Sequence, residues 1–502
     1  MKGVVAAGHP LTAEAGAGVL REGGNAVDAA VAAVLASFAV ESPLTGFGAG
    51  GFMMVHGEGV GTTLIDFFVA APGLDGAERS AELVPVPVHF DAETVQTFYV
   101  GPASCGVPGT AAGLELALER FGTVPLAELA APAIRLAREG APVNREQAYI
   151  LDILAPIHER LEGTRELYAP AGRALREGDV FRFPELAVTL ERFGAEGSEP
   201  FYRGDVAAAL SEFVAAGGGA LGPADLAGYA AIERQPIRAP FRGTEVLTNP
   251  PPSSGGILIA YCLGLLERMA QRSGPEQLVA AMDATNRARG EDFADGLYGV
   301  GLEEALLDPA RLDLMAADLL GSTTHISVLD RDGLCASVTC SNGSGSGVLV
   351  PGTGVILNNM LGEEDLNPLG FHAIAPGRRV PSMMAPTVVL REGEIELGLG
   401  SAGSNRIRSA IVQTVVRALE EGMDAGDAVR APRLHFEQGM VQAEPGIDEE
   451  ALARIEARGI PVLRRPRINL FFGGVQAVAR DRDTGALGGG GDPRRGGSVT
   501  TA

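Results

Sequence analysis

The sequence predicts an α+β fold in which layered β-sheets are covered by helices. The chain up to about residue 320 has mainly helical periodicity, whereas the part from Thr323 onward consists of short β-runs separated by turns. Two later helical segments, 406–419 and 449–458, can cover these runs. Hydrophobic residues make up 46% of the 502 residues, which is ample for a large core.

Residues 11–40 form the first expected helix. Gly23 and Gly24 interrupt its pattern, and Asn25 is a good N-cap for the alanine-rich second half, because its side chain can accept from free N–H groups. The chain then changes to strand-like and turn-like patterns. The elements expected there are a glycine-rich turn at 45–51, strands at 52–56 and 65–69, and a loop with one edge strand at 75–104.

The stretch from Thr110 to about Leu320 is expected to be mainly helical, with prolines and glycines between the helices. Pro275 fits the first position of one such helix, where its missing N–H costs nothing. Expected helices are 111–121, 126–138 and 275–289, and the strands expected after Thr323 are 325–329, 334–339, 348–350, 354–357 and 394–398.

The composition argues against several classes of partner and cofactor. With 40 basic and 63 acidic residues the net charge is −23, whereas nucleic acids and anionic lipids bind basic faces. No cysteine belongs to a CxxC pair and the seven histidines are scattered, so neither a metal site nor a cofactor is predicted. The cysteines are expected to be reduced and buried: Cys105, Cys262, Cys335 and Cys340.

The N-terminal segment, residues 1–12, has no apolar h-region and no Ala-x-Ala site, so no secretion signal is recognised. The most apolar early stretch, 26–40, carries Asp28 and is too short to span a bilayer. We therefore expect a cytoplasmic protein that does not associate with membranes.

The first functional hint is a hairpin with hydroxyl residues at its open end. Asp-Arg-Asp-Gly between two β-runs is a good hairpin signal, and pairing Asp330 with Gly333 fixes the register. Thr323 would then lie opposite Cys340, and Ser341 follows one step further, which brings two hydroxyl groups close together. A threonine at a strand start is more often structural than catalytic, because threonine is common in strands.

A glycine- and serine-rich loop, 341–347, follows the same hairpin. Such loops let the backbone approach a ligand closely. A phosphate-binding P-loop would end in Gly-Lys-Ser or Gly-Lys-Thr, and this loop does not. His325 alternates with Ile326 in the first strand and is expected to be a packed structural histidine rather than a metal ligand.

A series of short motifs, spread in order over nearly the whole chain, resembles the γ-glutamyltranspeptidase family. The Pro-Pro-Pro-Ser-Ser-Gly-Gly and Thr-Thr-His strings are the most specific of them. The matching segments are 23–30, 46–51, 107–110, 250–256, 323–328, 357–359, 385–387, 431–433 and 492–494.

The resemblance implies a four-layer αββα sandwich with an added mainly helical region, made by autocatalytic cleavage of one precursor. The cut would fall between Ser322 and Thr323. It would leave a large subunit, 1–322, that is mainly helical with some strands, and a strand-rich small subunit, 323–502. The two subunits would form a heterodimer and one catalytic unit.

The resemblance also implies the catalytic roles. Thr323 would be the nucleophile, and once it is the chain terminus its own α-amine, with a pKa near ~7.7–8.0, would be its base. Ser341 would take the place of a family threonine that hydrogen-bonds the nucleophile. The backbone N–H groups of Gly403 and Ser404 would stabilise the oxyanion, although the family has glycine at the second position.

Two positions of the expected acyl pocket depart from the family. The family binds the α-carboxylate of the γ-glutamyl group with an arginine where this chain has Phe68. It also uses a second serine, after Ser382, where this chain has Met383. Losing a bidentate arginine–carboxylate pair would cost about 2–5 kcal/mol of binding. Arg378 or Arg379 could replace the lost arginine, and a solvated surface pair is the equal alternative.

The residues that would hold the α-amino group are also changed. Asn342 is the best counterpart of a family asparagine, in a loop that is shorter than usual. The family's ligand carboxylate corresponds to Glu363 if no gap is placed, or to Asp365 if two residues are inserted. An exposed acidic run is the alternative interpretation of both.

Three functions remain open. The first is a γ-glutamyltransferase or γ-glutamyl hydrolase that cleaves a small-molecule amide through an acyl-enzyme. The second is an acylase or amidohydrolase for a less polar acyl group, which Phe68 and Met383 favour. The third is an inactive binding homologue in which Ser404 and the short loop prevent turnover. The retained Thr323, Ser341 and Gly403 argue against it.

Overall fold

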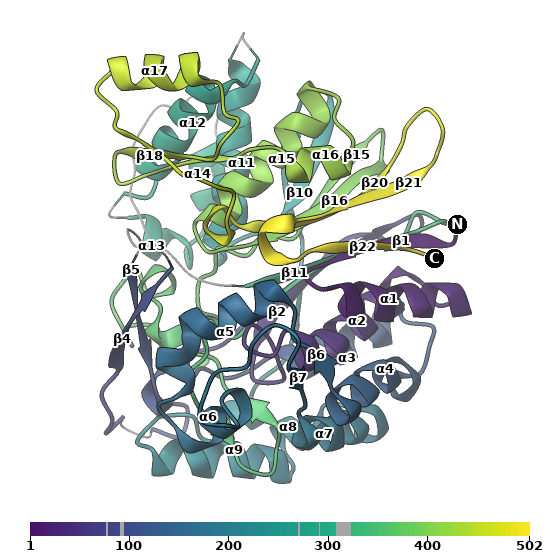
Figure 1. Cartoon of the computed structure of the whole chain (residues 1–502), viewed down its shortest axis with the longest axis vertical. Helices are drawn as coiled ribbons and strands as arrows, with labels where there is room; N and C mark the ends of the chain where they lie inside the picture. The colour runs from purple at the N-terminus through teal and green to yellow at the C-terminus, as the bar shows by residue number, and fades with distance from the viewer. Residues whose placement is uncertain (77–78, 91–94, 270–271, 291, 308–322) are drawn as a thin grey trace.

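The computed structural model describes residues 1–76, 79–90, 95–269, 272–290, 292–307 and 323–502. Two antiparallel β-sheets lie face to face, and helices cover the outer face of each sheet (Figure 1). The layers therefore follow the order helix, sheet, sheet, helix. This arrangement is the αββα sandwich that the resemblance implies.

The first sheet has seven strands in the order β22-β1-β11-β12-β2-β3-β8. Strands of both predicted subunits are mixed in it, because β11, β12 and β22 follow residue 322 and the other four precede it. The bounds are β1 Gly3–Ala7, β2 Gly50–Gly57, β3 Gly61–Phe67, β8 Ile232–Arg234, β11 Thr324–Asp330, β12 Cys335–Ser341 and β22 Ser498–Thr501.

The second sheet has six strands in the order β21-β20-β16-β15-β10-β9. Strand side chains alternate between the two faces, so in β1 Val4 and Ala6 pack between the sheets, whereas Val5 and Ala7 pack against the outer helices. The bounds are β9 Ile237–Phe241, β10 Thr244–Thr248, β15 Thr387–Arg391, β16 Glu394–Ala402, β20 Gly474–Arg480 and β21 Leu487–Gly491.

The outer layer on the first sheet is built by helices of the N-terminal half. Helices α1 and α2 contact β1 and β11, and α3 contacts β3. The bounds in this half are α1 Pro10–Glu22, α2 Ala26–Val40, α3 Thr110–Phe121, α4 Leu126–Glu139, α5 Arg145–His158, α6 Glu162–Tyr168, α7 Pro184–Glu196, α8 Glu199–Tyr202, α9 Asp205–Ala216 and α10 Pro223–Ala227.

The outer layer on the second sheet combines helices from both predicted subunits. Helix α11 contacts β9, α15 contacts β16, and α16 contacts β20. The bounds are α11 Ser254–Arg268, α12 Pro275–Arg287, α13 Phe293–Gly296, α14 Leu302–Leu307, α15 Arg406–Glu420, α16 Ala425–Arg430 and α17 Glu449–Ala457.

Small sheets and 3-10 turns complete the fold: β4 Val84–His89, β5 Val95–Val100, β6 Ala141–Pro142, β7 Val180–Phe181, β13 Leu349–Val350, β14 Val355–Ile356, β17 Leu434–Glu437, β18 Met440–Ala443, β19 Val462–Arg464, η1 Pro102–Ser104, η2 Met360–Gly362, η3 Glu364–Leu366, η4 Leu470–Phe472 and η5 Pro493–Arg495.

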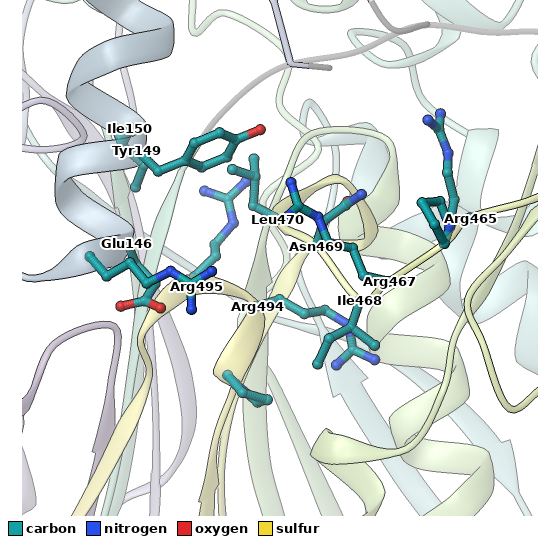
Figure 2. Close-up of a pocket in the computed structure, with 13 residues that line it drawn as sticks. Glu146, Tyr149, Ile150, Arg465, Arg467, Ile468, Asn469, Leu470, Arg494 and Arg495 are labelled. Carbon is teal, nitrogen blue, oxygen red and sulfur yellow. The ribbon is translucent and has the colours of Figure 1, made fainter. Parts of the chain in front are cut away.

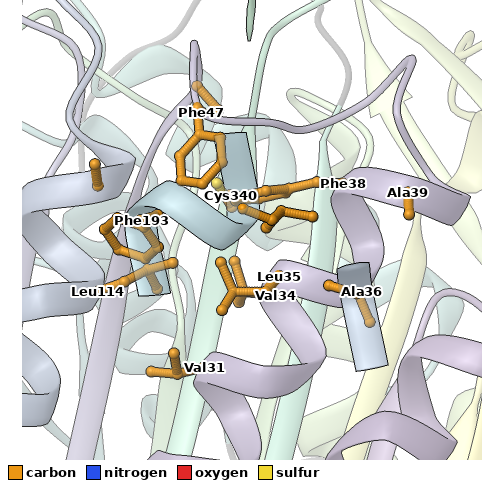
Figure 3. Close-up of a cluster of buried hydrophobic side chains, with 14 of the residues drawn as sticks. Val31, Val34, Leu35, Ala36, Phe38, Ala39, Phe47, Leu114, Phe193 and Cys340 are labelled. Carbon is orange, nitrogen blue, oxygen red and sulfur yellow. The ribbon is translucent and has the colours of Figure 1, made fainter. Parts of the chain in front are cut away.

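Helix α2 is buried along its whole length. Its predicted N-cap is confirmed: Asn25 Oδ1 accepts from the Asp28 N–H at 3.0 Å, and Asp28 accepts from the Asn25 N–H at 2.9 Å. Its alanines let neighbouring elements approach closely. Figure 3 shows its larger side chains packed with residues from the surrounding elements: Val31, Val34, Leu35 and Phe38 with Phe47, Leu114, Phe193 and Cys340.

Two expectations about the elements are wrong. The single helix at 11–40 is two helices, because Gly23 ends α1 with a left-handed φ of 106°. The 75–104 stretch holds two paired strands, β4 and β5, and the prolines Pro85 and Pro87 are exposed on β4, whose only partner in the described chain is β5. The region after Thr110 is mainly helical, as expected, and it also contains the strands β8, β9 and β10, which are too short to give a clear alternating pattern.

Two of the family-like motifs meet in a buried ion network. Asp492 lies 2.7 Å from Arg433 and 3.1 Å from Arg494, and Arg494 also pairs with Glu444. Burial acts to raise the pKa of Asp492, but the charges of the two arginines outweigh it and lower this pKa. The network ties the end of the chain to the strand-rich region, since Asp492 also accepts from the Val475 N–H at 2.8 Å.

Asp492→Asn is expected to lower the free energy of unfolding by about 3–5 kcal/mol, because it leaves two arginines buried without their counter-charge. Urea unfolding measures the loss. The matched control is Asp427→Asn, which removes an exposed partner of Arg430 and should cost about 0–1 kcal/mol. Equal losses of unfolding free energy in the two variants would show that the buried network stabilises the fold no more than an exposed ion pair does.

Candidate active site

In the hairpin of β11 and β12 the position opposite Thr323 differs by one residue from the predicted register. Thr324 pairs with Cys340, so Thr323 comes level with Ser341 rather than with Cys340. The predicted register was wrong because the turn has three residues: the Asp330 N–H donates to the Leu334 carbonyl at 3.0 Å, and Gly333 adopts a φ of 90°. The corrected register brings the two hydroxyl residues to the same level.

A small cavity at this end of the hairpin brings most of the predicted site residues together. Its volume is about 20 Å³, room for about one water molecule. The predicted residues that line it are Phe68, Thr323, Ser341, Glu363, Asp365, Ser382, Met383 and Ser404. Sequence reasoning missed the four other lining residues, all of them apolar: Met360, Leu366, Met384 and Ile407.

Gly403 and Ser404 form the turn between β16 and α15. Their φ angles are 118° and 60°, in a region that glycine enters freely and other residues rarely adopt. Their carbonyl groups accept from the N–H groups of Arg406 and Ile407 at 3.1 and 2.8 Å. The turn therefore stands at the N-terminus of α15, where the helix dipole favours a developing negative charge. Gly403 does not line the cavity itself; it directly precedes Ser404, which does.

Glu363 and Asp365 are both buried in the cavity wall, each 4% exposed. The interpretation as an exposed acidic run is wrong for these two residues, although Glu364 between them is exposed. Burial, together with the charge of Asp365, raises the pKa of Glu363 well above its usual range. Burial raises the pKa of Asp365 to about 7, against a hydrogen bond that Ser404 Oγ donates to it at 2.6 Å. Both carboxyl groups therefore keep their protons to a higher pH than exposed carboxyl groups do.

The wall opposite these acids is apolar and is supported by the Pro-Pro-Pro-Ser-Ser-Gly-Gly segment. Phe68 stacks on Phe52 with ring centroids 5.3 Å apart. Ser253 Oγ donates to the Ser382 carbonyl at 2.8 Å. A Cβ on Gly255 would lie 2.1 Å from the Met383 carbonyl oxygen, so only glycine lets this segment pack so closely against the Ser382–Met383 loop.

A comparison of the chain with protein-family models shows which family it belongs to. The family model described as Gamma-glutamyltranspeptidase matches residues 12–502. The chain belongs to the γ-glutamyltranspeptidase family. The predicted family, fold and enzyme class are therefore confirmed.

Two relatives within this family carry different names. The Acylase ACY 1 proenzyme of Pseudomonas sp. (strain SE83) is 34% identical over 511 residues, which cover 96% of this chain and 90% of that protein. The Glutathione hydrolase proenzyme of Bacillus subtilis (strain 168) is 32% identical over 544 residues, which cover 99% of this chain and 91% of that protein.

Solved structures agree with the family assignment. The cephalosporin acylase from Bacillus halodurans superposes with a TM-score of 0.83 at 26% identity, over 100% of this chain and 96% of that one. The Helicobacter pylori gamma-glutamyltranspeptidase gives a TM-score of 0.54 at 30% identity, over 60% of this chain and 87% of that one.

Neither arginine that was considered as a replacement for the family's carboxylate-binding arginine lines the cavity. Arg379 lies 3.2 Å from the Asp66 carboxylate and stacks on Tyr229. Arg378 is exposed and stacks on Tyr298. Both are held by other contacts, so Phe68 has no basic substitute among the described residues around the cavity.

Asn342 is buried beside the cavity, and both polar atoms of its side chain lack a hydrogen-bond partner among the described residues. Buried amides are usually bonded, so this side chain has hydrogen-bonding capacity left for a ligand. Ser341 Oγ, next to it, accepts from the Gly343 N–H at 2.9 Å. The predicted roles of both residues stay predictions.

Two charged residues behind Thr323 were missed by the sequence analysis. Glu41 accepts hydrogen bonds from Thr324 Oγ1 and Thr12 Oγ1, both at 2.7 Å. Arg495 donates to the Thr323 carbonyl oxygen at 3.4 Å. A lone acidic residue directly after the mainly apolar helix α2 is the one signal that could have pointed to Glu41.

His325 is buried in β11 and bonded to hydroxyl groups of Thr339 and Ser327 at 2.8 and 2.9 Å. Burial lowers its pKa to about 3, which keeps it neutral.

The four cysteines are free and buried, as expected. The described residues contain no group of three His, Cys, Asp or Glu side chains able to hold a metal ion. They also contain no helix that is long and apolar enough to cross a membrane, and the cytoplasmic location stays a prediction.

The pKa of Asp365 predicts how stability changes with pH. In the folded protein it is about 7, above the ordinary value of 3.8. Between these values the folded state keeps a proton that the unfolded chain has released, so stability falls as the pH rises. From pH 5 to pH 7 the wild type should lose about 2 kcal/mol in total relative to Asp365→Asn, and the slope should flatten towards pH 7, where the folded state also begins to release the proton.

Urea unfolding of both proteins across this range measures the difference. Glu364→Gln, which changes the exposed neighbour, is the control and should follow the wild type. Parallel curves for the wild type and Asp365→Asn would contradict the raised pKa.

Proposed function

We propose that this chain is a proenzyme that cleaves itself between Ser322 and Thr323 and then acts as an N-terminal-threonine amidohydrolase or acyltransferase. The observation that carries the proposal is the common cavity in which Thr323 and Ser341 meet the turn at the N-terminus of α15. Ser322 lies outside the described residues, so the position of the cut rests on the family resemblance.

The chemistry follows from a free N-terminal threonine. Thr323 Oγ attacks the amide carbonyl while the α-amine takes up the hydroxyl proton. The oxyanion is stabilised by the backbone N–H groups of Gly403 and Ser404 and by the helix dipole. The C–N bond then breaks, the leaving nitrogen takes the proton from the α-ammonium group, and the acyl group stays on Thr323 as an ester. Water or another amine then accepts the acyl group and restores the hydroxyl.

The uncut chain has too little space for this reaction. Ligand sites usually measure about 300–1,000 Å³, and the cavity measures about 20 Å³. An acyl group therefore enters only after neighbouring atoms have moved. This restriction fits a proenzyme whose cavity opens on maturation.

After cleavage the two fragments stay together as a heterodimer. In the first sheet, β11 of the small fragment pairs with β1 of the large one over five residues, and β12 pairs with β2 over seven. In the second sheet, β15 pairs with β10. Separating the fragments would expose both sheet edges and the core between the sheets, so the hydrolysed bond leaves the fold intact.

The cavity favours an acyl group without a free carboxylate. Among its described lining residues none is basic, and Phe68 and Met383 present an apolar wall. A carboxylate buried there without a cation would lose several kcal/mol, on the order of the desolvation cost of an unpaired charge. An acylase activity on a less polar acyl group is therefore the preferred form of the proposal, and one relative carries the name acylase.

A γ-glutamyl donor is the second candidate. Ionised Glu363 or Asp365 can meet an α-ammonium group, and the unpartnered amide of Asn342 can donate to an α-carboxylate. Another relative carries the name glutathione hydrolase. A small-molecule amide is the substrate in both forms.

Maturation is tested with denaturing gels and N-terminal sequencing. Purified protein should give two fragments, the smaller beginning with Thr323, and Thr323→Ser should still cleave because it keeps a hydroxyl. Thr323→Ala should remain one inactive chain, since it lacks the nucleophile. A wild-type chain that stays whole and inactive would favour a binding homologue, and a whole chain with amidase activity would refute the N-terminal nucleophile.

Phe68→Arg tests the acyl pocket through kcat/KM for a γ-glutamyl anilide and for an uncharged acyl anilide. The new guanidinium should raise kcat/KM for the γ-glutamyl anilide by about tenfold or more and lower it for the uncharged one. Phe68→Leu is the matched control, because it changes size without adding charge. A wild type that already prefers the γ-glutamyl donor, with no gain from arginine, would mean that another group binds the carboxylate.

A further inference from the structure

Glu41 is a buried acid that the proposed reaction does not use. It directly follows α2 and is 5% exposed. Each of its carboxylate oxygens accepts one hydrogen bond at 2.7 Å, Oε1 from Thr12 Oγ1 and Oε2 from Thr324 Oγ1. Thr12 belongs to α1, whereas Thr324 is the first residue of β11 and directly follows Thr323. Glu41 therefore joins the predicted large subunit to the second residue of the predicted small one.

A positive charge accompanies this acid. Burial raises the pKa of Glu41, against both hydrogen bonds and the charge of Arg495, and the two residues line one small cavity of about 30 Å³. Arg495 ends η5 and lies beside Glu146 of α5 (Figure 2). Its guanidinium donates to the Thr323 carbonyl oxygen at 3.4 Å. Two buried charged side chains thus contact the start of the predicted small subunit, one at its first carbonyl group and one at its second side chain.

Gly8 leaves the space that Glu41 occupies. It directly follows β1, and a Cβ at this position would collide with Glu41 Oε2 and would lie 3.1 Å from Thr324 Oγ1. A larger residue would push the carboxylate away from the hydroxyl. The close approach of backbone and side chain that glycine permits is therefore a condition for this contact.

The start of β11 needs such contacts because one neighbouring strand ends early. Among the described strand pairs, β1 accompanies β11 only as far as Ile326, which lies opposite Ala7, whereas β12 continues to Thr324. Cleavage would turn Thr323 into a chain terminus, and termini are poorly ordered unless they are tied down. A reacting hydroxyl that moves by 1 Å can lose about a hundredfold in rate.

We propose that Glu41 is a positioning residue that, together with Arg495, holds Thr323 in its reacting position, above all once cleavage has made it a chain terminus. This inference rests on the proposed function and deepens it. Glu41 acts through the hydroxyl of Thr324 and exchanges no proton with the substrate. Since it does not line the acyl cavity, its loss should lower kcat and leave KM nearly unchanged.

Thr324→Val and Thr12→Val form a matched pair that tests the proposal. Each removes one buried hydroxyl that donates to Glu41 at 2.7 Å, so urea unfolding should show similar losses of stability. Only Thr324 belongs to the predicted small subunit. Thr324→Val should lower kcat at least about tenfold, the effect of one hydrogen bond to a charged group, and Thr12→Val should lower it much less.

Thr324→Ser restores a hydroxyl at the same position and should recover most of the lost kcat. A Thr324→Val chain that stays whole while Thr12→Val is cut also supports the proposal, because the Thr323 hydroxyl carries out the cut as well. Equal kcat losses in the two valine variants, or a loss that serine does not recover, would overturn the positioning role.

Hydrogen exchange of the segment 323–326 gives a readout that needs no turnover. If the wild type is neither cut nor active, the proposed function fails. The segment should then still exchange about tenfold faster in Thr324→Val than in Thr12→Val, because only the first variant releases it from Glu41. Equal exchange rates in the two variants would refute the inference, whether or not the chain is an enzyme.

Discussion

Strand β11 is paired on both edges, with β1 on one side and β12 on the other, and the geometry of the site depends on this double pairing. The pairing fixes the position of Thr323, which directly precedes β11 and lies level with Ser341. A slip of one residue would turn every buried side chain of β11 to the opposite face, so the packing of two cores holds the hydroxyl in place. Because the neighbours on either side come from different predicted subunits, the same contacts connect the fragments after cleavage.

The buried acids give the cavity its chemical character. Glu363 accepts from the Ser344 N–H at 2.9 Å, and Asp365 accepts from Ser404 Oγ at 2.6 Å. These bonds offset part of the free-energy cost of burying two ionised carboxyl groups. The part of this cost that is not offset favours the protonated form of both groups. The strained turn at Ser404 is thereby tied to the acid wall, so the proposed oxyanion site and the proposed acyl pocket are coupled through one hydrogen bond.

Most of the site could be predicted because its residues lie in motifs that a single sequence displays. Phe68 and Met383 were recognised through the strings around them, and both line the cavity. The one-residue error in the hairpin arose because a three-residue turn with Gly333 at positive φ cannot be told from a two-residue turn by composition alone.

The contacts behind Thr323 could not be predicted. Glu41 reaches Thr324 across 283 residues of sequence, and Arg495 reaches Thr323 across 172. Such contacts depend on the stacking of two sheets, and no periodic pattern records them. The strands β9 and β10 were missed for a related reason, since β10 is recognisable only beside β15 and β9 only beside β10.

The most direct test of the account is the mass of the small fragment after rapid mixing with a slowly deacylated amide or ester donor. The account predicts an added mass equal to the acyl group, located by fragmentation on the peptide that begins with Thr323. It also predicts that the adduct is released when an amine acceptor is added. Turnover with an adduct on any other residue, or with no covalent adduct under conditions that trap the acyl group, would contradict it.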